Sequence, residues 1–195
     1  MNAPKTLDDD PTLQAIRHEY ELPHVLEHAL EHAVRAPSTH NSQPWAFEIE
    51  GSSVRVYADP KRALPVCDTD GRELLVSLGC LVHHLRVALA HLGRPHDVRY
   101  LPEHYDPDLI AELTVHAQAP EPMANEALFR PMALRSTDRS AYAPAVPPAQ
   151  VLDAIRAAAR SEGGELVALE SEGARARLVD LITEAGDRGG VGDED

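Results

Sequence analysis

The chain has 195 residues, which is enough for one domain, or for one domain and part of a second. It carries 32 acidic and 18 basic residues, so its formal net charge is −14. This balance argues against nucleic acid or an anionic membrane as a partner, because clustered Lys and Arg dominate the binding of both. The two cysteines, Cys67 and Cys80, are too few for a disulfide framework or a four-cysteine zinc site. We expect a loop thiol and a core residue rather than a redox pair.

The first ten residues, MNAPKTLDDD, contain no apolar stretch and include three consecutive acids. A secretory signal needs an apolar segment and a transit peptide avoids acids, so we expect a cytoplasmic protein. Residues 1–20 are expected to be an extended or loosely helical lead-in. The apolar run Leu74–Val82 is about half as long as a membrane span requires, and we expect no membrane partner.

The first regular elements are predicted between residues 26 and 58. Apolar residues recur at helical spacing from Leu26 to Val34, and Pro37 is expected to stop this helix. Apolar and polar residues then alternate over 45–49 and 54–58, on either side of a turn at 51–53. This alternation predicts a hairpin with one buried face.

The longest predicted helix runs from Asp70 to Leu92. Its centre, LLVSLGCLV, is apolar on nearly all sides, which is typical of a helix buried on several sides. Asp70 and Glu73 have the spacing of a capping box at its start, and Gly93 is expected to end it.

The remaining elements are predicted from periodicity and breakers. In chain order we expect strands at 98–101 and 109–115, a Pro-rich boundary at 117–123, helices at 126–135 and from Val151, a strand at 166–169, and a last helix at 174–182. The Gly- and Asp-rich tail, 186–195, is expected to be disordered.

The sequence contains a possible internal repeat. Val25-Leu26-Glu27 and Val151-Leu152-Asp153 are similar and lie 126 positions apart, and the apolar stripes that follow them align. Either one module occurs twice, or two unrelated amphipathic helices align by chance. Under the repeat interpretation, residues 21–120 form a first half and residues 121–185 a partial second half.

The segment from Arg35 to Trp45, RAPSTHNSQPW, combines a helix end, two prolines, several hydroxyls and amides, and a tryptophan. Composition alone fits an ordinary loop between a helix and a strand, where such residues are common. The order of the residues resembles the R-x-P-S-x-x-N-x-Q-P-W signature of the FMN-dependent nitroreductase family. The matching residues are Arg35, Pro37, Ser38, Asn41, Gln43, Pro44 and Trp45.

The resemblance extends to a second motif. Arg135, Thr137 and Arg139 match the family's R-x-S/T-x-R segment, and Tyr142 takes the place of the aromatic residue that follows it. DTDGRELL, at the start of the long predicted helix, is similar to the Acg-type branch, in which two nitroreductase-like halves lie in one chain. The resemblance implies an α+β fold in which an antiparallel sheet packs with a long central helix, with a second copy that is partial here.

The resemblance also implies the cofactor site. In family dimers, one subunit supplies the arginine motif and its mate the P-S-x-x-N loop. Here each half keeps only one of the two motifs, so we expect one composite FMN site per chain. The expected cofactor-binding residues are Arg35, Pro37, Ser38, Thr39, Asn41, Gln43, Arg135, Thr137 and Arg139. Two arginines can hold a phosphate bidentately despite the acidic chain. Without the resemblance, an exposed ion pair with Asp138 would be the favoured interpretation of Arg135 and Arg139.

Three functions follow. The first is an oxidoreductase in which NAD(P)H reduces FMN and a nitroaromatic or quinone-type acceptor reoxidises it, within a homodimer or a pseudo-dimer made by one chain. The second is a non-catalytic flavin-binding protein or a degenerate, truncated copy, because the second half lacks its own hairpin and central helix. The third is an apolar half-module that only dimerises.

One further pattern has a simpler interpretation. His28, Glu31 and His32 spell the H-x-x-E-H pattern of some zinc proteases. These residues lie opposite the Leu26 and Leu30 stripe, so we expect a solvated polar face and no metal site.

Overall fold

The computed structural model describes residues 11–102, 106–116, 126–142 and 145–189. The chain divides into two compact units, with the division between Arg139 and Ser140. The arginine motif therefore lies at the end of the first unit, in the same unit as the P-S-x-x-N loop. The predicted repeat itself stays a prediction.

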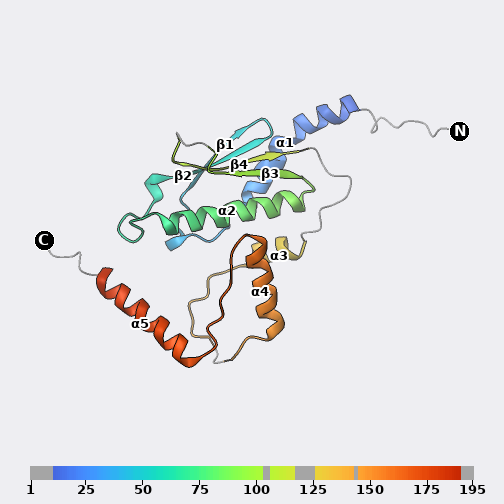
Figure 1. Cartoon of the computed structure of the whole chain (residues 1–195). Helices are drawn as coiled ribbons and strands as arrows, with labels where there is room; N and C mark the ends of the chain where they lie inside the picture. Colours follow the sequence, from blue (N-terminus) through green and yellow to red (C-terminus); the bar gives the residue numbers. More distant parts are fainter. Residues whose placement is uncertain (1–10, 103–105, 117–125, 143–144, 190–195) are drawn as a thin grey trace. The chain divides into compact units, whose positions relative to one another are not determined.

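The first unit contains a four-stranded antiparallel sheet (Figure 1). Its strands are β1 (Trp45–Glu50), β2 (Ser53–Ala58), β3 (His96–Tyr100) and β4 (Leu109–Val115), in the order β1-β2-β4-β3. The predicted hairpin and the two later strands are confirmed, with β3 beginning two residues earlier than expected. Helices combined with an antiparallel sheet confirm the α+β class.

The two faces of the sheet differ as the alternation in sequence predicts. On β2, Val54 and Val56 are fully buried, whereas Arg55 and Tyr57, which alternate with them along the strand, are only partly covered. Arg55 forms ion pairs with Glu48 at 3.3 Å and with Glu112 at 3.3 Å on the neighbouring strands. One face therefore belongs to the core, and the other is a solvated network of cross-strand charge pairs.

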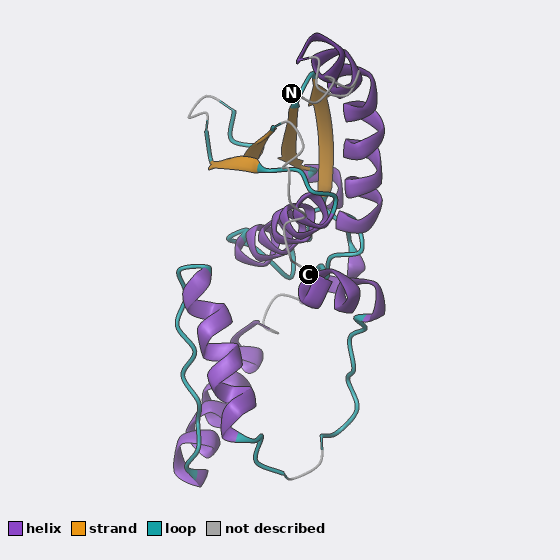
Figure 2. Ribbon diagram, turned by 90° about the vertical axis from the view of Figure 1, so that its right-hand side faces the viewer, coloured by secondary structure: helices purple, strands orange, loops and turns teal. Residues whose placement is uncertain are grey.

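Two long helices complete the core of the first unit (Figure 2). α1 spans Pro11–Ala33 and α2 spans Arg72–His91, and the two pack against each other. Leu78, Leu81 and Leu85 of α2 are fully buried, which confirms the long central helix. α1 already begins at Pro11, so residues 11–20 agree with the helical alternative for the lead-in; residues 1–10 lie outside the described part.

The start of α2 is capped differently from the prediction. The Asp68 carboxylate accepts hydrogen bonds from the backbone N–H groups of Glu73 at 3.1 Å and Leu74 at 2.8 Å. Asp70 accepts only one, from Arg72 N–H at 3.4 Å. Gly71, with φ of 72°, turns the chain so that Asp68 reaches the first turn. The predicted capping box is therefore wrong, and Asp68 satisfies the free N–H groups of the helix.

Among the described residues, α2 is the one helix that is long and apolar enough to cross a membrane by length and composition. Within its most apolar window, 56% is buried inside the protein. A helix in the core of a water-exposed protein has the same properties, so this feature by itself indicates no membrane.

The helix α3 (Glu126–Leu134) closes the first unit and agrees with the prediction to within one residue. It contacts α2, and Met132 is its buried residue. The backbone N–H of Arg135 donates to the Pro131 carbonyl at 2.8 Å, so the helical turn continues to Arg135.

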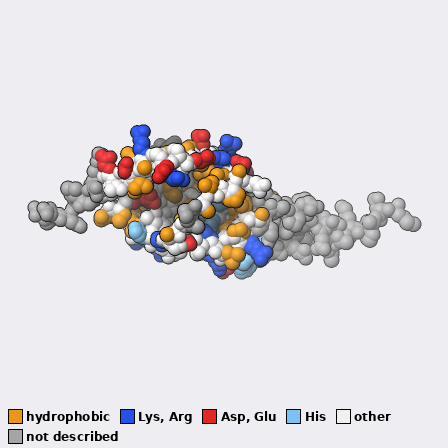
Figure 3. Space-filling view, turned by 90° about the horizontal axis from the view of Figure 1, so that it is seen from below, with side chains coloured by type: hydrophobic (Ala, Val, Ile, Leu, Met, Phe, Trp, Pro, Cys, Tyr) orange, Lys and Arg blue, Asp and Glu red, His pale blue; other side chains and the backbone are white. Residues whose placement is uncertain are grey.

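The second unit consists of two helices, α4 (Ala149–Ser161) and α5 (Glu172–Gly189), in its described part. No side chain of α4 is buried. The expected strand at 166–169 is wrong: these residues are irregular, and no strand is described in this unit with which they could pair. Residues 186–189, expected to be disordered, belong to α5, and residues 190–195 lie outside the described part. Figure 3 shows apolar side chains exposed among charged ones on one face of the molecule.

The capping role of Asp68 can be tested by substitution. Asp68→Ala leaves two N–H groups at the start of α2 without their acceptor, so we expect the unfolding free energy to fall by about 1–2 kcal/mol. Asp70→Ala removes the same charge but only one long hydrogen bond, and it should cost clearly less. Chemical denaturation of both variants measures the difference, and an equal loss in the two would contradict the assignment.

Candidate functional site

The loop that joins α1 to β1 has an unusual backbone. His40, Asn41 and Gln43 have φ values of 51°, 56° and 50°, in the left-handed region that non-glycine residues seldom adopt. Three such residues within four positions store conformational strain, which persists only where the surroundings enforce it. Strain of this kind tends to gather at binding sites, which makes this loop the first candidate.

Hydrogen bonds within the loop and to its neighbours enforce this conformation. The Ser38 hydroxyl accepts from Gln43 N–H at 3.0 Å, and the Gln43 side-chain amide donates to the Val34 carbonyl at 3.3 Å. Arg62, from the 3₁₀ helix η3 (Pro60–Arg62), donates to the Gln43 carbonyl at 3.3 Å. Pro44, which follows, is fully buried, so the end of the loop is anchored in the core.

The middle of the loop is attached to the first turns of α2. Thr39, which opens the 3₁₀ helix η2 (Thr39–Asn41), donates its N–H to Ser77 Oγ at 3.3 Å and its hydroxyl to Glu73 Oε2 at 3.0 Å. Arg62, Glu73 and Ser77 were not among the residues predicted for the site. Ser77 carried one usable signal, since it is a lone hydroxyl within an apolar helical run.

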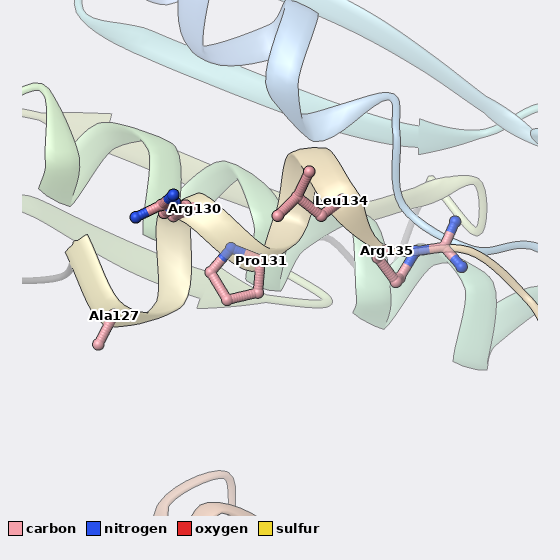
Figure 4. Close-up of a pocket in the computed structure, with 5 residues that line it drawn as sticks. All are labelled: Ala127, Arg130, Pro131, Leu134 and Arg135. Atoms are coloured by element: carbon pink, nitrogen blue, oxygen red, sulfur yellow. The ribbon is translucent and has the colours of Figure 1, made fainter.

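Arg135 connects the two predicted motifs across 100 residues of sequence. Its guanidinium donates to the Arg35 carbonyl at 3.3 Å and to the Thr137 hydroxyl at 3.4 Å. A shallow hollow lined by Ala127, Arg130, Pro131, Leu134 and Arg135 lies along α3, and Figure 4 shows these residues along the helix from Ala127 at one end to Arg135 at the other. The start of the P-S-x-x-N loop and the arginine motif are therefore neighbours in the first unit.

Arg139 is not brought to this place. It is exposed, and within the described residues it makes no hydrogen bond or ion pair with the loop. Residues 136–139 are not helical, so the four-residue spacing does not place Arg135 and Arg139 on one face. Asn41 is exposed, and Pro37 is partly covered. The role of these residues as cofactor ligands stays a prediction.

Two titratable side chains of α2 lie within the electrostatic influence of Arg135. His84 is only 7% exposed, and its Nδ1 has no hydrogen-bond partner among the described residues. Burial, assisted by His83 and Arg135, lowers the pKa of His84 to about 4. Burial raises the pKa of the half-buried Cys80 thiol, and Arg135 opposes that shift. At neutral pH both side chains are therefore uncharged. Cys67 is exposed, as expected for a loop thiol.

The H-x-x-E-H segment is only partly a solvated face. His28 Nδ1 lies 3.3 Å from Glu31 Oε2, and both side chains are exposed. The ring of His32 instead packs edge-on against Phe129 of α3, with 4.7 Å between the centroids, so the expectation was wrong for this residue. Within the described residues, no group of three or more His, Cys, Asp or Glu side chains is arranged to hold a metal ion.

The chain matches no family model. It is 37% identical over 154 residues to the Mycobacterium tuberculosis protein named "Putative NAD(P)H nitroreductase Rv3131", a match that covers 78% of this chain and 43% of the relative. It is also 38% identical over 89 residues to the M. tuberculosis protein named "Putative NAD(P)H nitroreductase acg", covering 46% of this chain and 27% of that protein. The chain belongs to the nitroreductase family.

This nitroreductase chain spans less than half the length of the curated relatives it matches. Among solved structures, a nitroreductase family protein from Clostridium difficile aligns with 76% of this chain and 86% of its own, at 18% identity and a TM-score of 0.40. The family assignment therefore depends on the sequence relatives.

His84 should make the stability of this nitroreductase chain depend on pH. Its folded-state pKa is about 4, below the usual 6.5, so the folded state binds fewer protons than the unfolded state between these values. The unfolding free energy should therefore fall as the pH drops from about 6.5 towards 4. In His84→Leu this fall should be smaller by roughly 2 kcal/mol. Part of the fall should remain, because burial also lowers the pKa of His32 and of His96.

Urea denaturation at several pH values measures this effect. His24→Leu, which changes an exposed histidine of α1, is the matched control. If the unfolding free energy of His84→Leu falls as steeply with decreasing pH as that of the wild-type chain, His84 is not the buried titrating group.

Proposed function

We propose that this chain forms the flavin site of a cytoplasmic oxidoreductase that uses NAD(P)H to reduce a nitroaromatic or quinone-type acceptor. One observation carries the proposal: the guanidinium of Arg135 lies 3.3 Å from the Arg35 carbonyl, beside the strained P-S-x-x-N loop. Family membership supports the reaction class, because relatives are named as NAD(P)H nitroreductases. The choice of FMN and of the acceptor belongs to this proposal alone.

The residues present fit a ligand that carries a phosphate. Arg135 is exposed, and the Thr137 hydroxyl lies next to its guanidinium. A chain with a net charge of −14 repels an anion unless a cation is placed locally, and a guanidinium offers several donors in a fixed plane. Arg135 and Thr137 would therefore hold the phosphate of FMN.

The strained loop fits the polar part of a flavin. Asn41 is exposed and carries both a donor and an acceptor, while Ser38 and Thr39 are occupied in holding the loop in shape. A bound flavin would supply the hydride and electron chemistry, so the protein needs to provide position, charge and access. Cys80 keeps its proton and His84 stays neutral, so neither adds charge beneath the site.

A non-catalytic flavin-binding protein is the competing proposal. The observation that favours it is the second unit, whose described residues form two helices without a strand and whose α4 buries no side chain. Bound FMN without oxidation of NADH or NADPH, in the presence of a nitroaromatic or quinone acceptor, would support sequestration. A chain that binds no FMN would contradict both proposals.

Flavin binding can be separated into its phosphate and ring parts. Arg135→Ala should weaken FMN binding at least about tenfold, as expected for the loss of a charge-assisted contact, and leave riboflavin binding nearly unchanged. Arg99→Ala, which removes an exposed arginine of β3, is the control and should bind FMN like the wild-type chain. Flavin fluorescence titration measures the binding of FMN and riboflavin to the wild-type chain and to both variants. Equal losses of FMN and riboflavin affinity in Arg135→Ala would argue against a phosphate contact.

The nitroreductase chain is further proposed to act as a pair of like halves, either two chains or two parts of one chain. Leu75 and Val76 of α2 are 50% and 64% exposed, which leaves part of an apolar helix uncovered in the first unit. Exposed apolar surface of this kind favours association.

Sedimentation velocity at two concentrations distinguishes the two arrangements. If two chains pair, Leu75→Glu should shift the chain towards monomer, because it places a charge within the contact. Val66→Glu changes a loop residue that is 90% exposed and should leave the distribution unaltered. A concentration-independent monomer would argue against a homodimer.

A further inference from the structure

Three rings from three helices of the first unit meet at one point. The ring of His91, at the end of α2, stacks on Phe129 of α3 with 3.7 Å between the centroids and an angle of 6° between the planes. His32 of α1 approaches the same phenyl ring edge-on, at 4.7 Å and 63°. Phe129 is partly buried and packs against the core. We call His32, His91 and Phe129 the aromatic clasp.

The helix α3 needs such a contact to hold its place. It has nine residues and contains Pro131, which removes one helical hydrogen bond. A helix this short does not persist alone in water. Met132 is its one buried residue among those described, while Leu128 and Leu134 are 50% and 75% exposed. Phe129 and Met132, three positions apart on one face, are therefore the attachment of α3 to the core.

The position of α3 decides the position of Arg135. The hydrogen bond from Arg135 N–H to the Pro131 carbonyl, 2.8 Å long, makes Arg135 continuous with the helix. Arg135 lies six positions after Phe129, a rise of about 9 Å along the helix. A shift of the phenyl ring therefore also moves Arg135. By contrast, the contacts of Arg135 itself, at 3.3 and 3.4 Å, are long and lie at the surface. Such contacts are too weak to place a helix by themselves.

The charges around the clasp favour a neutral His32. Burial lowers the pKa of His32, and the nearby charges of His28, Arg35 and His91 act in the same direction, whereas Glu31 opposes them. The edge contact with Phe129 therefore involves an uncharged ring at neutral pH.

We propose that His32, Phe129 and His91 are positioning residues that set Arg135 against the P-S-x-x-N loop and thereby give the site its affinity for the phosphate of a flavin mononucleotide. This inference rests on the proposed function, because it takes Arg135 to be the phosphate ligand. The clasp does not touch the ligand and acts only through α3. It should therefore affect ligands with a phosphate and spare those without one.

The test uses the full chain with Phe129→Leu, which keeps an apolar side chain but removes the ring. We expect FMN affinity to fall at least about fivefold, approaching the loss in Arg135→Ala, while riboflavin affinity changes less than about twofold. Phe129→Tyr retains the ring and should restore FMN affinity to near the wild-type value. Leu128→Ala, at the exposed neighbouring position of α3, is the matched control and should change neither affinity.

Hydrogen exchange provides a readout that needs no ligand. In Phe129→Leu, the backbone amides of Arg130 and of residues 132–135 should exchange several-fold faster, while those of β2 and β4 keep the wild-type rates. Faster exchange with an unchanged ratio of FMN to riboflavin affinity would overturn the proposal, because the clasp would then serve stability alone. Unchanged exchange would also overturn it.

A failure of the proposed function would look different. If the wild-type chain bound neither FMN nor riboflavin, the flavin site would be refuted, whereas the attachment of α3 by the clasp would still be decided by the exchange rates. If riboflavin bound as tightly as FMN in the wild-type chain, Arg135 would not be a phosphate ligand, and the inference would fall with it.

Discussion

The burial of α2 against α1 and the sheet is the constraint on which the rest of the first unit depends. Fully buried leucines on this helix fix its rotation, and the rotation decides where its polar residues point. Ser77, His84 and His91 are spaced seven apart, so they lie along one face. Ser77 accepts from Thr39 of the loop, His84 lies within the influence of Arg135, and His91 stacks on Phe129. The packing of α2 thus places polar residues beside the loop, near Arg135 and against α3.

This dependence explains which features could be predicted from the sequence. The spacing of apolar residues, every second position in a strand and every third or fourth in a helix, reflects burial directly. The hairpin, the long helix and α3 were therefore predicted to within about two residues. The loop was found because residue order, rather than composition, resembles a family signature. Burial patterns do not report which polar partner is chosen. Asp68 and Asp70 are equally good caps in sequence, and the turn at Gly71 decides between them.

The remaining errors arise where the deciding contact is distant in sequence. His32 reads as part of a polar stripe on α1, and only Phe129, almost a hundred residues later, places its ring against a neighbour. The segment 166–169 has the residues of a strand but no partner strand among the described residues of its unit. Propensity for a strand is realised only through pairing, so local sequence overstates it.

Several costs of folding lie at or near the candidate site. Three residues of the loop adopt left-handed backbone conformations, as does Leu101 elsewhere, and His84 buries a ring nitrogen that has no hydrogen-bond partner among the described residues. Each feature destabilises the folded state, and neither is needed to build the sheet or to bury α2. Local departures from favourable structure that converge on one place are expected where a protein is built for a ligand. Because Arg135 donates to the Arg35 carbonyl at the start of this loop and also influences His84, these costs support the phosphate site that we propose.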